Sequence, residues 1–460
     1  MSYELIVIGG GPGGYVAAIR AAQLGAKVAV VERDAVGGTC LNRGCIPTKA
    51  LIASTSTLAN IKHAADFGIK VDGFSVDFSQ IMARKDAIVK QLIGGINYLF
   101  KKNKVDLITG TAKLQGAGKV EVAKADGTTE LLETKNIILA TGSEPALISA
   151  LGYNGKTVIT SNEALELEAI PESLLVIGGG VIGCEFATIF AELGTQVTIV
   201  EAMPSILPLI DQELTRRLTT ILKKKGITVR TNAMIKSVSQ ANDGMVAVLE
   251  SGEEITAEKV LISIGRTFNT KGLGLEEAGV ALGPKGEILV NEYLETNVPG
   301  IYAIGDVTNK IQLAHVASSQ GIVAVENIFG AKKKAMDYSV VPSCIFTSPE
   351  VASVGISSQD AEARGLNVKI GKFPFQASGK ALCIGETDGL VKFIADAEND
   401  KILGVHILGP HATDLIAEAA LAIRMGVTAE QLATTIHAHP TLAETLMEAA
   451  EGVHGKTIHA

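Results

Sequence analysis

Two cysteines, Cys40 and Cys45, are the first residues of this sequence whose type and spacing suggest chemistry, because they stand five positions apart. Pro47 follows at a place typical of the first turn of a helix, so Cys45 is expected near a helix N-terminus. That position, with a nearby cation such as Lys49, stabilises a thiolate, which is the form that attacks disulfides. The loop therefore predicts a short, reducible disulfide, against the alternative of two buried thiols. The other cysteines lack such surroundings and are expected in the core: Cys184, Cys344 and Cys383.

A second candidate group lies near the end of the sequence, where His439 precedes Glu444 by five residues across Pro440. Histidine titrates near neutrality, and thiol exchange needs a group that accepts a proton from an entering dithiol and returns it later. A carboxylate hydrogen-bonded to one ring nitrogen would set the tautomer and stabilise the imidazolium. The alternative is a surface histidine before a C-terminal helix. His437, two residues earlier, is expected to be structural.

Two copies of one pattern supply elements that would position these groups. Leu5-Ile-Val-Ile-Gly-Gly-Gly and Leu174-Leu-Val-Ile-Gly-Gly-Gly are 169 residues apart, and the same offset separates two Leu-Gly pairs, Leu24-Gly25 and Leu193-Gly194. In each copy an apolar run meets a glycine cluster, a helical pattern ends at Leu-Gly, and a second apolar run stops at an acid, Glu32 or Glu201. Strand, tight turn, helix, strand and acid form the βαβ dinucleotide-binding fingerprint, which occurs twice.

The glycines of each copy have separate tasks in that fingerprint. The first permits a tight turn, the second lets a pyrophosphate approach the backbone, and the third allows close helix packing, while the helix N-terminus attracts the anion. A merely flexible glycine turn is the alternative, but the complete context argues against it. Two dinucleotides in one chain indicate electron transfer between a flavin and a nicotinamide, and hence a redox enzyme. The glycines are Gly9, Gly11 and Gly14 in one copy, and Gly178, Gly180 and Gly183 in the other.

The acid after each second strand bears on the kind of dinucleotide. A carboxylate there accepts hydrogen bonds from ribose hydroxyls and repels a 2′-phosphate, whereas an NADP site favours arginine. Residues 202–205 after Glu201 include no arginine. The sequence therefore predicts NAD rather than NADP, with a solvated acid at the strand end as the alternative reading of Glu201.

Composition narrows the class of protein further. A length of 460 residues predicts about three domains, and 47% hydrophobic with 20% charged residues is typical of a folded globular chain. A net charge of -8 without a long basic stripe argues against nucleic acid as a partner. No stretch without a charged side chain is longer than residues 311–325, which are too few to span a membrane, and the early apolar run leaves no room for a secretory signal. Five cysteines, an odd number, favour a reducing cytoplasm.

Over essentially its full length the sequence resembles the class I flavoprotein disulfide reductases, the pyridine nucleotide-disulfide oxidoreductases. Besides the fingerprints and the cysteine loop, the resemblance rests on Ala140-Thr-Gly142, Ile264-Gly-Arg266, Ile304-Gly-Asp306 and His437-Ala-His-Pro-Thr441. Arg43 and Thr48 depart from the residues that other members often carry in the cysteine loop. The resemblance implies one tightly bound FAD per subunit, NAD as co-substrate and no metal. It also implies oxidation of a dihydrolipoyl group on a lipoyl-bearing carrier protein or acyltransferase of a 2-oxo acid dehydrogenase or glycine cleavage complex.

The resemblance implies roles for single residues as well. Cys40 would exchange with the substrate and Cys45 would lie beside the flavin, while Glu444 would orient His439 as the acid and base. Lys49 and Glu185 would pair near the flavin N5 atom. The remaining FAD contacts would come from Glu32, Thr39, Ala112, Thr141, Gly142, Asp306, Gln312, Leu313, Ala314 and His315. NAD would meet Glu201, Ile235 and Gly265.

The implied fold is α/β, with two Rossmann-like dinucleotide-binding domains and a C-terminal α+β dimerisation domain. The expected domains are residues 1–148 for FAD, 149–269 for NAD, 270–338 for the second FAD segment and 339–460 for dimerisation. Because relatives place the histidine in the partner subunit's site, the protein is expected to be a homodimer. The alternatives are a glutathione or mercuric reductase, a transhydrogenase, and a non-enzymatic flavin-holding subunit or NADH sensor.

Overall fold

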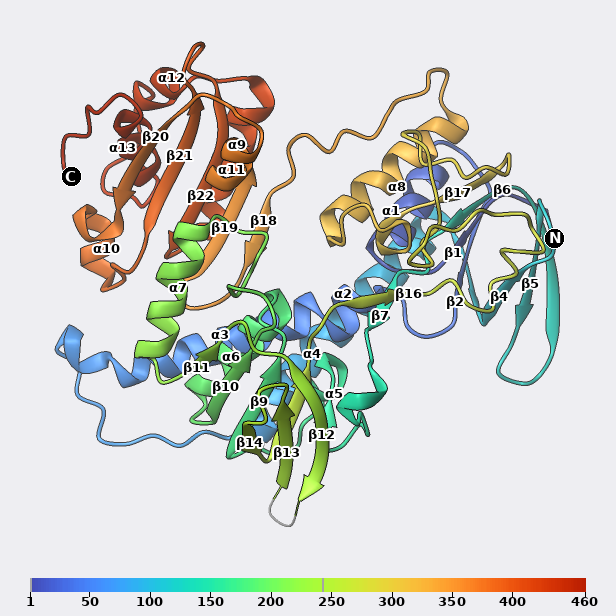
Figure 1. Ribbon diagram of the computed structural model, residues 1–460. Coiled ribbons are helices and arrows are strands. Elements are labelled where there is room, and N and C mark those ends of the chain that lie inside the picture. The colour runs from blue at the N-terminus through green and yellow to red at the C-terminus, as the bar shows by residue number, and fades with distance from the viewer. Residues whose placement is uncertain (1, 242–243) are drawn as a thin grey trace. The chain divides into compact units, whose positions relative to one another are not determined.

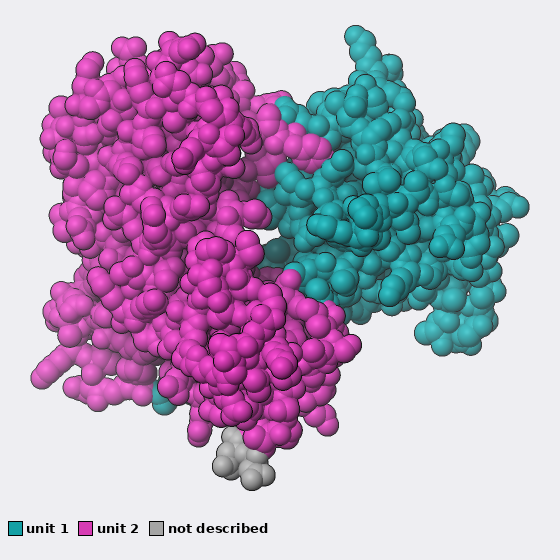
Figure 2. All heavy atoms as spheres, in the orientation of Figure 1, with its two compact units in different colours: residues 1–51, 75–146, 265–337 teal, residues 52–74, 147–264, 338–460 magenta. Residues whose placement is uncertain are grey.

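A computed structural model describes residues 2–241 and 244–460. The chain forms two compact units, each assembled from segments that are far apart in sequence. Unit 1 comprises residues 1–51, 75–146 and 265–337, and unit 2 comprises residues 52–74, 147–264 and 338–460 (Figure 2).

Unit 1 is built on a seven-stranded sheet with the strand order β3-β2-β1-β6-β5-β4 and with β17 paired to β6. β1 (Ser2–Ile8) is parallel to its two neighbours, β2 (Val28–Glu32) and β6 (Thr129–Leu139). Residues 5–8 of β1 are all buried, as expected of a parallel strand that is covered on both faces. The other strands are β3 (Asp106–Thr109), β4 (Thr111–Leu114), β5 (Lys119–Ala123) and β17 (Ile301–Ala303). A separate two-stranded ribbon joins β7 (Ser143–Pro145) to β16 (Arg266–Phe268).

Two helices of unit 1 pack closely on one another, α1 (Pro12–Gln23) and α8 (Ala314–Phe329) (Figure 1). Glycine permits this approach, because a Cβ at Gly321 would lie 2.6 Å from the carbonyl oxygen of Gly13. The other helical segments of the unit are α2 (Gly38–Arg43), α4 (Phe78–Asn103) and the 3-10 helix η3 (Gly305–Thr308). The boundary between the units falls within α3 (Cys45–Lys62).

The first part of unit 2 contains a parallel sheet with the order β11-β10-β9-β15-β8. Its strands are β8 (Val158–Ile159), β9 (Ser173–Ile177), β10 (Gln196–Val200), β11 (Thr228–Arg230) and β15 (Lys259–Ile262). An antiparallel sheet follows, made of β12 (Ile235–Ala241), β13 (Gly244–Leu249) and β14 (Glu254–Ala257). The helices are α5 (Ser161–Ala164), α6 (Val181–Glu192) and α7 (Gln212–Lys224), with 3-10 turns η1 (Ala64–Phe67) and η2 (Ser149–Leu151).

The C-terminal part of unit 2 is an antiparallel sheet with the order β18-β19-β22-β21-β20. Its strands are β18 (Ser343–Ile345), β19 (Glu350–Gly355), β20 (Val368–Pro374), β21 (Leu390–Asp396) and β22 (Ile402–Gly409). Helix α11 (Ala412–Met425) packs on β19 and β22, and α13 (Glu444–Gly452) packs on β20. The shorter helices are α9 (Ser358–Ala363), η4 (Phe375–Ala377), α10 (Gly379–Ile384) and α12 (Ala429–Ala433).

This architecture confirms the expected fold class, with a βαβ unit at each glycine cluster and a C-terminal α+β part. The compact units do not divide the chain at the same places as the expected domains, since residues 147–264 and 338–460 share one unit. The domain boundaries therefore stay a prediction. Across the described ranges, no helix has both the length and the apolar character that crossing a membrane requires.

Candidate active site

The first glycine turn connects β1 to α1. Gly9 has a φ of +102°, and a Cβ there would lie 2.3 Å from the carbonyl oxygen of Ala140. A Cβ at Gly14 would lie 1.9 Å from the carbonyl oxygen of Gly9, so both positions require glycine. At Gly11, by contrast, the nearest atom to a Cβ would be Gly38 Cα at 3.7 Å. The turn thus brings the helix close to the strand and leaves room in front of the helix N-terminus, as a bound pyrophosphate requires.

Glu32 at the end of β2 completes this turn. Its Oε2 accepts a hydrogen bond from Gly10 N at 2.7 Å, and its Oε1 accepts one from Asp34 N at 2.9 Å. The carboxylate is therefore oriented at the carboxyl ends of the parallel strands, where the ribose of a dinucleotide lies in this kind of fold.

The second glycine turn, between β9 and α6, repeats the first in detail. Gly178 has a φ of +103°, and its Cβ would lie 2.4 Å from Ser263 O. A Cβ at Gly183 would lie 2.0 Å from Gly178 O, while one at Gly180 would meet no atom within 4 Å. Glu201 Oε2 accepts from Gly179 N at 2.6 Å, just as the first acid accepts from its own turn. Both turns therefore fit a dinucleotide.

The cysteine loop leaves the first turn through Gly37, whose amide donates to Gly10 O at 2.8 Å. Gly37 has a φ of +105° and precedes α2, which carries Cys40. Gly44 then separates α2 from α3, and a Cβ there would lie 2.8 Å from Thr39 O. Cys45 is the first residue of α3, as Pro47 predicted, and Lys49 lies one turn further along the same helix.

The two cysteines of the loop interact directly. A hydrogen bond with Cys45 raises the pKa of the half-buried Cys40 thiol far above its ordinary value, and burial and the charge of Cys45 raise it further. Lys49 acts in the opposite direction on the same thiol, by Coulomb attraction. The raised pKa favours the protonated form of Cys40, and the start of α3, where Cys45 lies, is a place at which the helix dipole would stabilise a thiolate.

The two departures from the family pattern have local partners. Arg43 forms an ion pair with Asp34 at the surface, and Thr48 Oγ1 donates to Gly44 O at 2.6 Å. The expectation that all other cysteines lie in the core was wrong in part. Cys184 is buried, but Cys344 is only half-buried, and Cys383 is exposed because the short helix α10 lies at the surface.

His439 and Glu444 come together at the start of α13, whose first residue is Glu444. His439 Nδ1 lies 2.9 Å from Glu444 Oε1, and Thr441 N donates to Glu444 Oε2 at 2.8 Å. Burial alone would raise the pKa of Glu444, but the hydrogen bonds from Thr441 and His439 outweigh it and lower that pKa. An ionised Glu444 on Nδ1 leaves Nε2 as the ring nitrogen that can exchange a proton, and the His439 side chain is 80% exposed.

His437 is held in a different way. Its Nε2 lies 2.8 Å from Glu418 Oε1 on α11, its Nδ1 lies 2.8 Å from Thr435 O, and its side chain is nearly buried. Both ring nitrogens are therefore engaged within the C-terminal part, which agrees with a structural role.

Asp306, predicted to bind FAD, belongs to a cluster that the sequence did not reveal. Ser143 Oγ donates to Asp306 Oδ2 at 2.5 Å, and Arg266 donates to Ser143 Oγ and Ser143 O, both at 2.6 Å. Asn269 is a second residue missed by sequence reasoning, since its side chain donates to Thr141 O at 2.9 Å. The motifs around Thr141 and Arg266 mark these segments, but no pattern of spacing pairs them.

The remaining predicted contacts stay predictions, although the structure places each residue in a helix or strand or next to one. Thr39 is in α2, Ala112 is buried in β4, Gln312 and Leu313 precede α8, and Ala314 and His315 begin it.

Glu185, predicted to lie near the flavin, is buried in α6 and accepts a hydrogen bond from Phe346 N at 3.0 Å. Gly142 has a φ of +68° and Gly265 one of +121°, and Ile235 begins β12. Within the described ranges, no group of three His, Cys, Asp or Glu residues could hold a metal ion.

Comparison with known proteins identifies the family. Residues 3–321 match the profile described as pyridine nucleotide-disulphide oxidoreductase, and residues 341–450 match the dimerisation domain of that family. Relatives named dihydrolipoyl dehydrogenase are 46% identical in Bacillus subtilis, over 99% of each chain, and 47% identical in Thermus scotoductus, over 100% of this chain and 99% of the relative. The solved structure of LpdA from Mycobacterium tuberculosis has a TM-score of 0.92 at 29% identity, over 97% of this chain and 99% of its own. The chain therefore belongs to the pyridine nucleotide-disulphide oxidoreductase family.

Proposed function

We propose that this chain is a dihydrolipoyl dehydrogenase, which oxidises a protein-bound dihydrolipoyl group to the disulfide and reduces NAD to NADH. The observation that carries the proposal is the interacting pair Cys40 and Cys45. The loop that carries both cysteines is bonded to the first glycine turn through Gly37 N and Gly10 O. Full-length relatives with this name support the substrate. The lipoyl-bearing partner would be a carrier protein or acyltransferase, and the odd number of cysteines favours the cytoplasm.

FAD is assigned to the Gly9 turn and NAD to the Gly178 turn. The cysteine loop is continuous with the first turn, so a flavin there would be within reach of the thiols, and Glu201 without a nearby arginine suits NAD. When bound, FAD supplies a two-electron acceptor for the thiolate pair and a donor for NAD.

The two cysteines would exchange disulfide bonds with the substrate. A substrate thiolate attacks Cys40 Sγ, the bond between Cys40 and Cys45 breaks, and Cys45 leaves as a thiolate. The second substrate thiolate attacks the substrate sulfur of this mixed disulfide, which closes the lipoyl disulfide and releases Cys40. Cys40 then takes up a proton, in agreement with its raised pKa, while Cys45 keeps the negative charge.

His439 would serve as the base for the entering thiol. Its Nε2 accepts the substrate proton while Glu444 holds Nδ1 and stabilises the imidazolium, and the same nitrogen later returns a proton to Cys40. We propose that His439 acts in the active site of the partner subunit, so that each complete site requires two subunits.

A homodimer is supported by large exposed apolar side chains in the C-terminal part of the chain. Leu421 and Met425 on α11 are 64% and 70% exposed, and Ile436, three residues before His439, is 97% exposed. Large exposed apolar groups of this kind mark association surfaces. Mixing Cys40→Ser and His439→Ala subunits tests the shared site, because one of the two sites in each heterodimer would be intact. Failure of reassorted heterodimers to recover activity would contradict the proposal.

The function is tested by comparing NAD with NADP as acceptors and dihydrolipoamide with reduced glutathione as donors. We expect turnover with dihydrolipoamide and NAD alone. Cys40→Ser should abolish it, whereas the matched variant Cys383→Ser, at an exposed cysteine outside the loop, should retain it. Equal rates with NADP or with glutathione, or an active Cys40→Ser protein, would overturn the assignment.

A further inference from the structure

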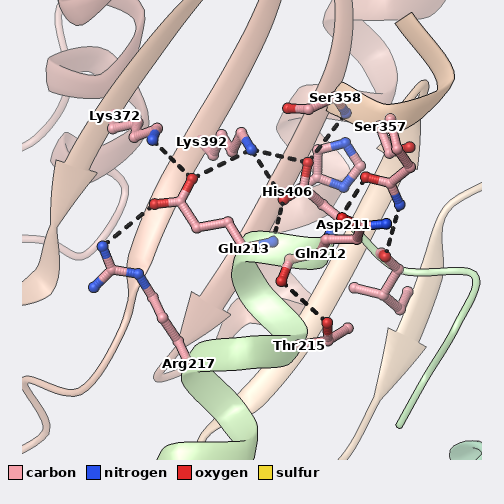
Figure 3. Close-up of polar contacts among 12 residues, drawn as sticks. Asp211, Gln212, Glu213, Thr215, Arg217, Ser357, Ser358, Lys372, Lys392 and His406 are labelled. Atoms are coloured by element: carbon pink, nitrogen blue, oxygen red, sulfur yellow. Dashed lines mark hydrogen bonds and ion pairs between the residues drawn. The ribbon is translucent and has the colours of Figure 1, made fainter. Parts of the chain in front are cut away.

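A buried ion pair lies outside every residue assigned so far. Lys392 Nζ on β21 is 2.9 Å from both carboxylate oxygens of Asp211, which precedes α7 (Figure 3). Asp211 is 0% exposed and Lys392 is 3% exposed. Because the cost of removing two charges from water offsets much of their attraction, such a pair is no more stabilising than well-packed apolar residues would be, and its distinct effect is to hold its neighbours in place.

The groups around the pair are polar and well ordered by hydrogen bonds. Glu213 lies 3.3 Å from Lys392 Nζ and also pairs with Lys372 at 2.7 Å and Arg217 at 3.3 Å. His406 on β22 is buried, with Nε2 2.8 Å from Ile356 O, and its Nδ1 has no hydrogen-bond partner among the described residues. Burial lowers the pKa of His406, so the ring is neutral and Lys392 is the cation that faces Asp211.

The pair fastens one short segment of backbone to the C-terminal sheet. Asp211 Oδ2 accepts from Ser358 N at 3.1 Å and Oδ1 accepts from Glu213 N at 3.0 Å, which caps α7. The side-chain amide of Gln359 donates to Ile210 O at 3.0 Å and accepts from Gln212 N at 3.3 Å. Residues 210–212 are therefore held on both sides by residues of the C-terminal part.

That segment is the end of the loop that crosses the second glycine turn. The loop begins at Glu201, whose Oε1 accepts from Met203 N at 2.7 Å, and Leu207 N donates to Gly179 O at 2.9 Å. Ile206 is buried against the turn, since a Cβ at Gly179 would lie 2.7 Å from its Cγ2. Leu207 has a φ of +48°, a conformation that a leucine keeps only when its surroundings enforce it.

We propose that Asp211 and Lys392 are positioning residues for NAD, because they anchor the loop that holds Glu201 and the second glycine turn. The inference rests on the proposed function, in which that turn binds NAD. The pair lies outside the residues assigned to either dinucleotide or to the substrate, and it would act through residues 202–210. The pair therefore connects the proposed NAD site to the C-terminal sheet. The first glycine turn and the two cysteines are not among the residues that make this connection.

The test is the substitution Lys392→Met in the full-length FAD-containing protein. We expect the KM for NAD and the Kd for NADH to rise about 10-fold. The rate at which dihydrolipoamide reduces the enzyme in the absence of NAD should stay unchanged. The rise in Tm that NAD produces in the wild type should shrink in parallel, which gives a readout that does not depend on turnover. The matched control is Lys372→Met, since Lys372 is the cross-strand neighbour of Lys392 and pairs with Glu213 Oε2 at 2.7 Å instead of with Asp211.

A second variant keeps the test decisive if Lys392→Met does not fold. Gln359→Ala removes only the clamp on residues 210–212 and leaves no buried charge unpaired, so we expect a rise of about 3-fold in the same two constants. Unchanged NAD affinity in a folded Lys392→Met or in Gln359→Ala overturns the inference, as does an equal loss in the dihydrolipoamide step. Failure of the wild type to bind or reduce NAD would instead refute the proposed function.

Discussion

The two dinucleotide turns have nearly the same backbone but lead to different chemistry. In each turn, the first glycine of the fingerprint, Gly9 or Gly178, lies close to a carbonyl oxygen at the end of a neighbouring strand. The third, Gly14 or Gly183, lies close to the carbonyl oxygen of the first. The glycine that follows the first, Gly10 or Gly179, donates its amide to the acid. The agreement extends to the exits, because Gly37 N donates to Gly10 O and Leu207 N donates to Gly179 O. The difference begins after these bonds.

The first exit continues into α2 and α3 and presents Cys40 and Cys45, whereas the second continues to Asp211 and the C-terminal sheet. Glycine sterics dictate the turn, and they leave the following residues unconstrained. The two glycine turns are therefore alike, and the loop that follows each turn determines its connection. The loop after the first turn leads to the two cysteines, and the loop after the second is bonded to the C-terminal sheet. Five substitution experiments can test this difference, beginning with those that should change the protein most.

Placing a methyl group at the third glycine should separate the two sites most sharply. Gly14→Ala should purify without flavin, because its Cβ would lie 1.9 Å from Gly9 O, whereas Gly183→Ala should keep the flavin and lose at least about 100-fold in NAD reduction. Visible absorbance of the purified protein and NAD kinetics measure the two effects. Gly94→Ala, in α4 with no atom near the new Cβ, is the control. Loss of flavin from both variants would show that the turns are not independent.

Replacing His439, the proposed base, should affect only the reaction of the thiols. We expect His439→Gln to slow reduction of the enzyme by dihydrolipoamide by about 100- to 10,000-fold, since no other group positioned by Glu444 can take the proton. Reduction of the enzyme by NADH should remain close to the wild-type rate. Stopped-flow measurement of each half reaction checks this, and a parallel fall in both would contradict the assignment.

The two acids should each affect their own dinucleotide. Glu201→Ala is expected to raise the KM for NAD about 10-fold and to reduce the preference over NADP, because ribose bonds and the bond to Gly179 N are lost together. Glu32→Ala should instead speed FAD dissociation and leave the KM for NAD unchanged. Steady-state kinetics and flavin release measure the two effects, and an exchange of phenotypes would reverse the assignment of cofactors.

Low pH should destabilise the loop that follows the second glycine turn more than the loop that follows the first. The second loop is anchored by the buried carboxylate of Asp211. Despite its burial, which alone would raise the pKa of Asp211, the bonds from Lys392 and Ser358 N lower it from 3.8 to about 2. A depressed folded-state pKa stabilises the fold above pH 3.8, and this contribution of about 2 kcal/mol is lost as the pH falls towards 2. Urea unfolding at pH 6 and at lower pH should show a shallower acid dependence in Asp211→Asn. Parallel slopes for variant and wild type would contradict this.

The smallest effect is expected at Arg43, in the first exit loop. Its ion pair with Asp34 is exposed, with side chains 38% and 57% accessible, and pairs of this kind contribute less than about 1 kcal/mol. Arg43→Ala should therefore change neither the unfolding free energy nor the half reactions measurably. Thermal unfolding and the dihydrolipoamide assay check this, and a clear change in the reduction rate would give Arg43 a role in the cysteine loop.

Features that depend on local sterics could be predicted from the amino-acid sequence alone. Gly9 and Gly178 identify the turns because no other residue tolerates their positive φ and close carbonyls, and Pro47 places Cys45 at the start of α3. The contact of His439 with Glu444 was also predictable, because only five positions separate the two residues, with Pro440 between them.

Contacts between groups that are far apart in the sequence could not be predicted, because they depend on how the whole chain folds. Asp211 and Lys392 are 181 residues apart, and Ser143 and Asp306 are 163 apart, so no local spacing pairs them. Cys383 was misplaced in the core because a six-residue helix shows no periodicity long enough to reveal its buried face. Such contacts depend on the order of strands in the sheets, which is set by the burial of many side chains together and not by any short stretch of sequence.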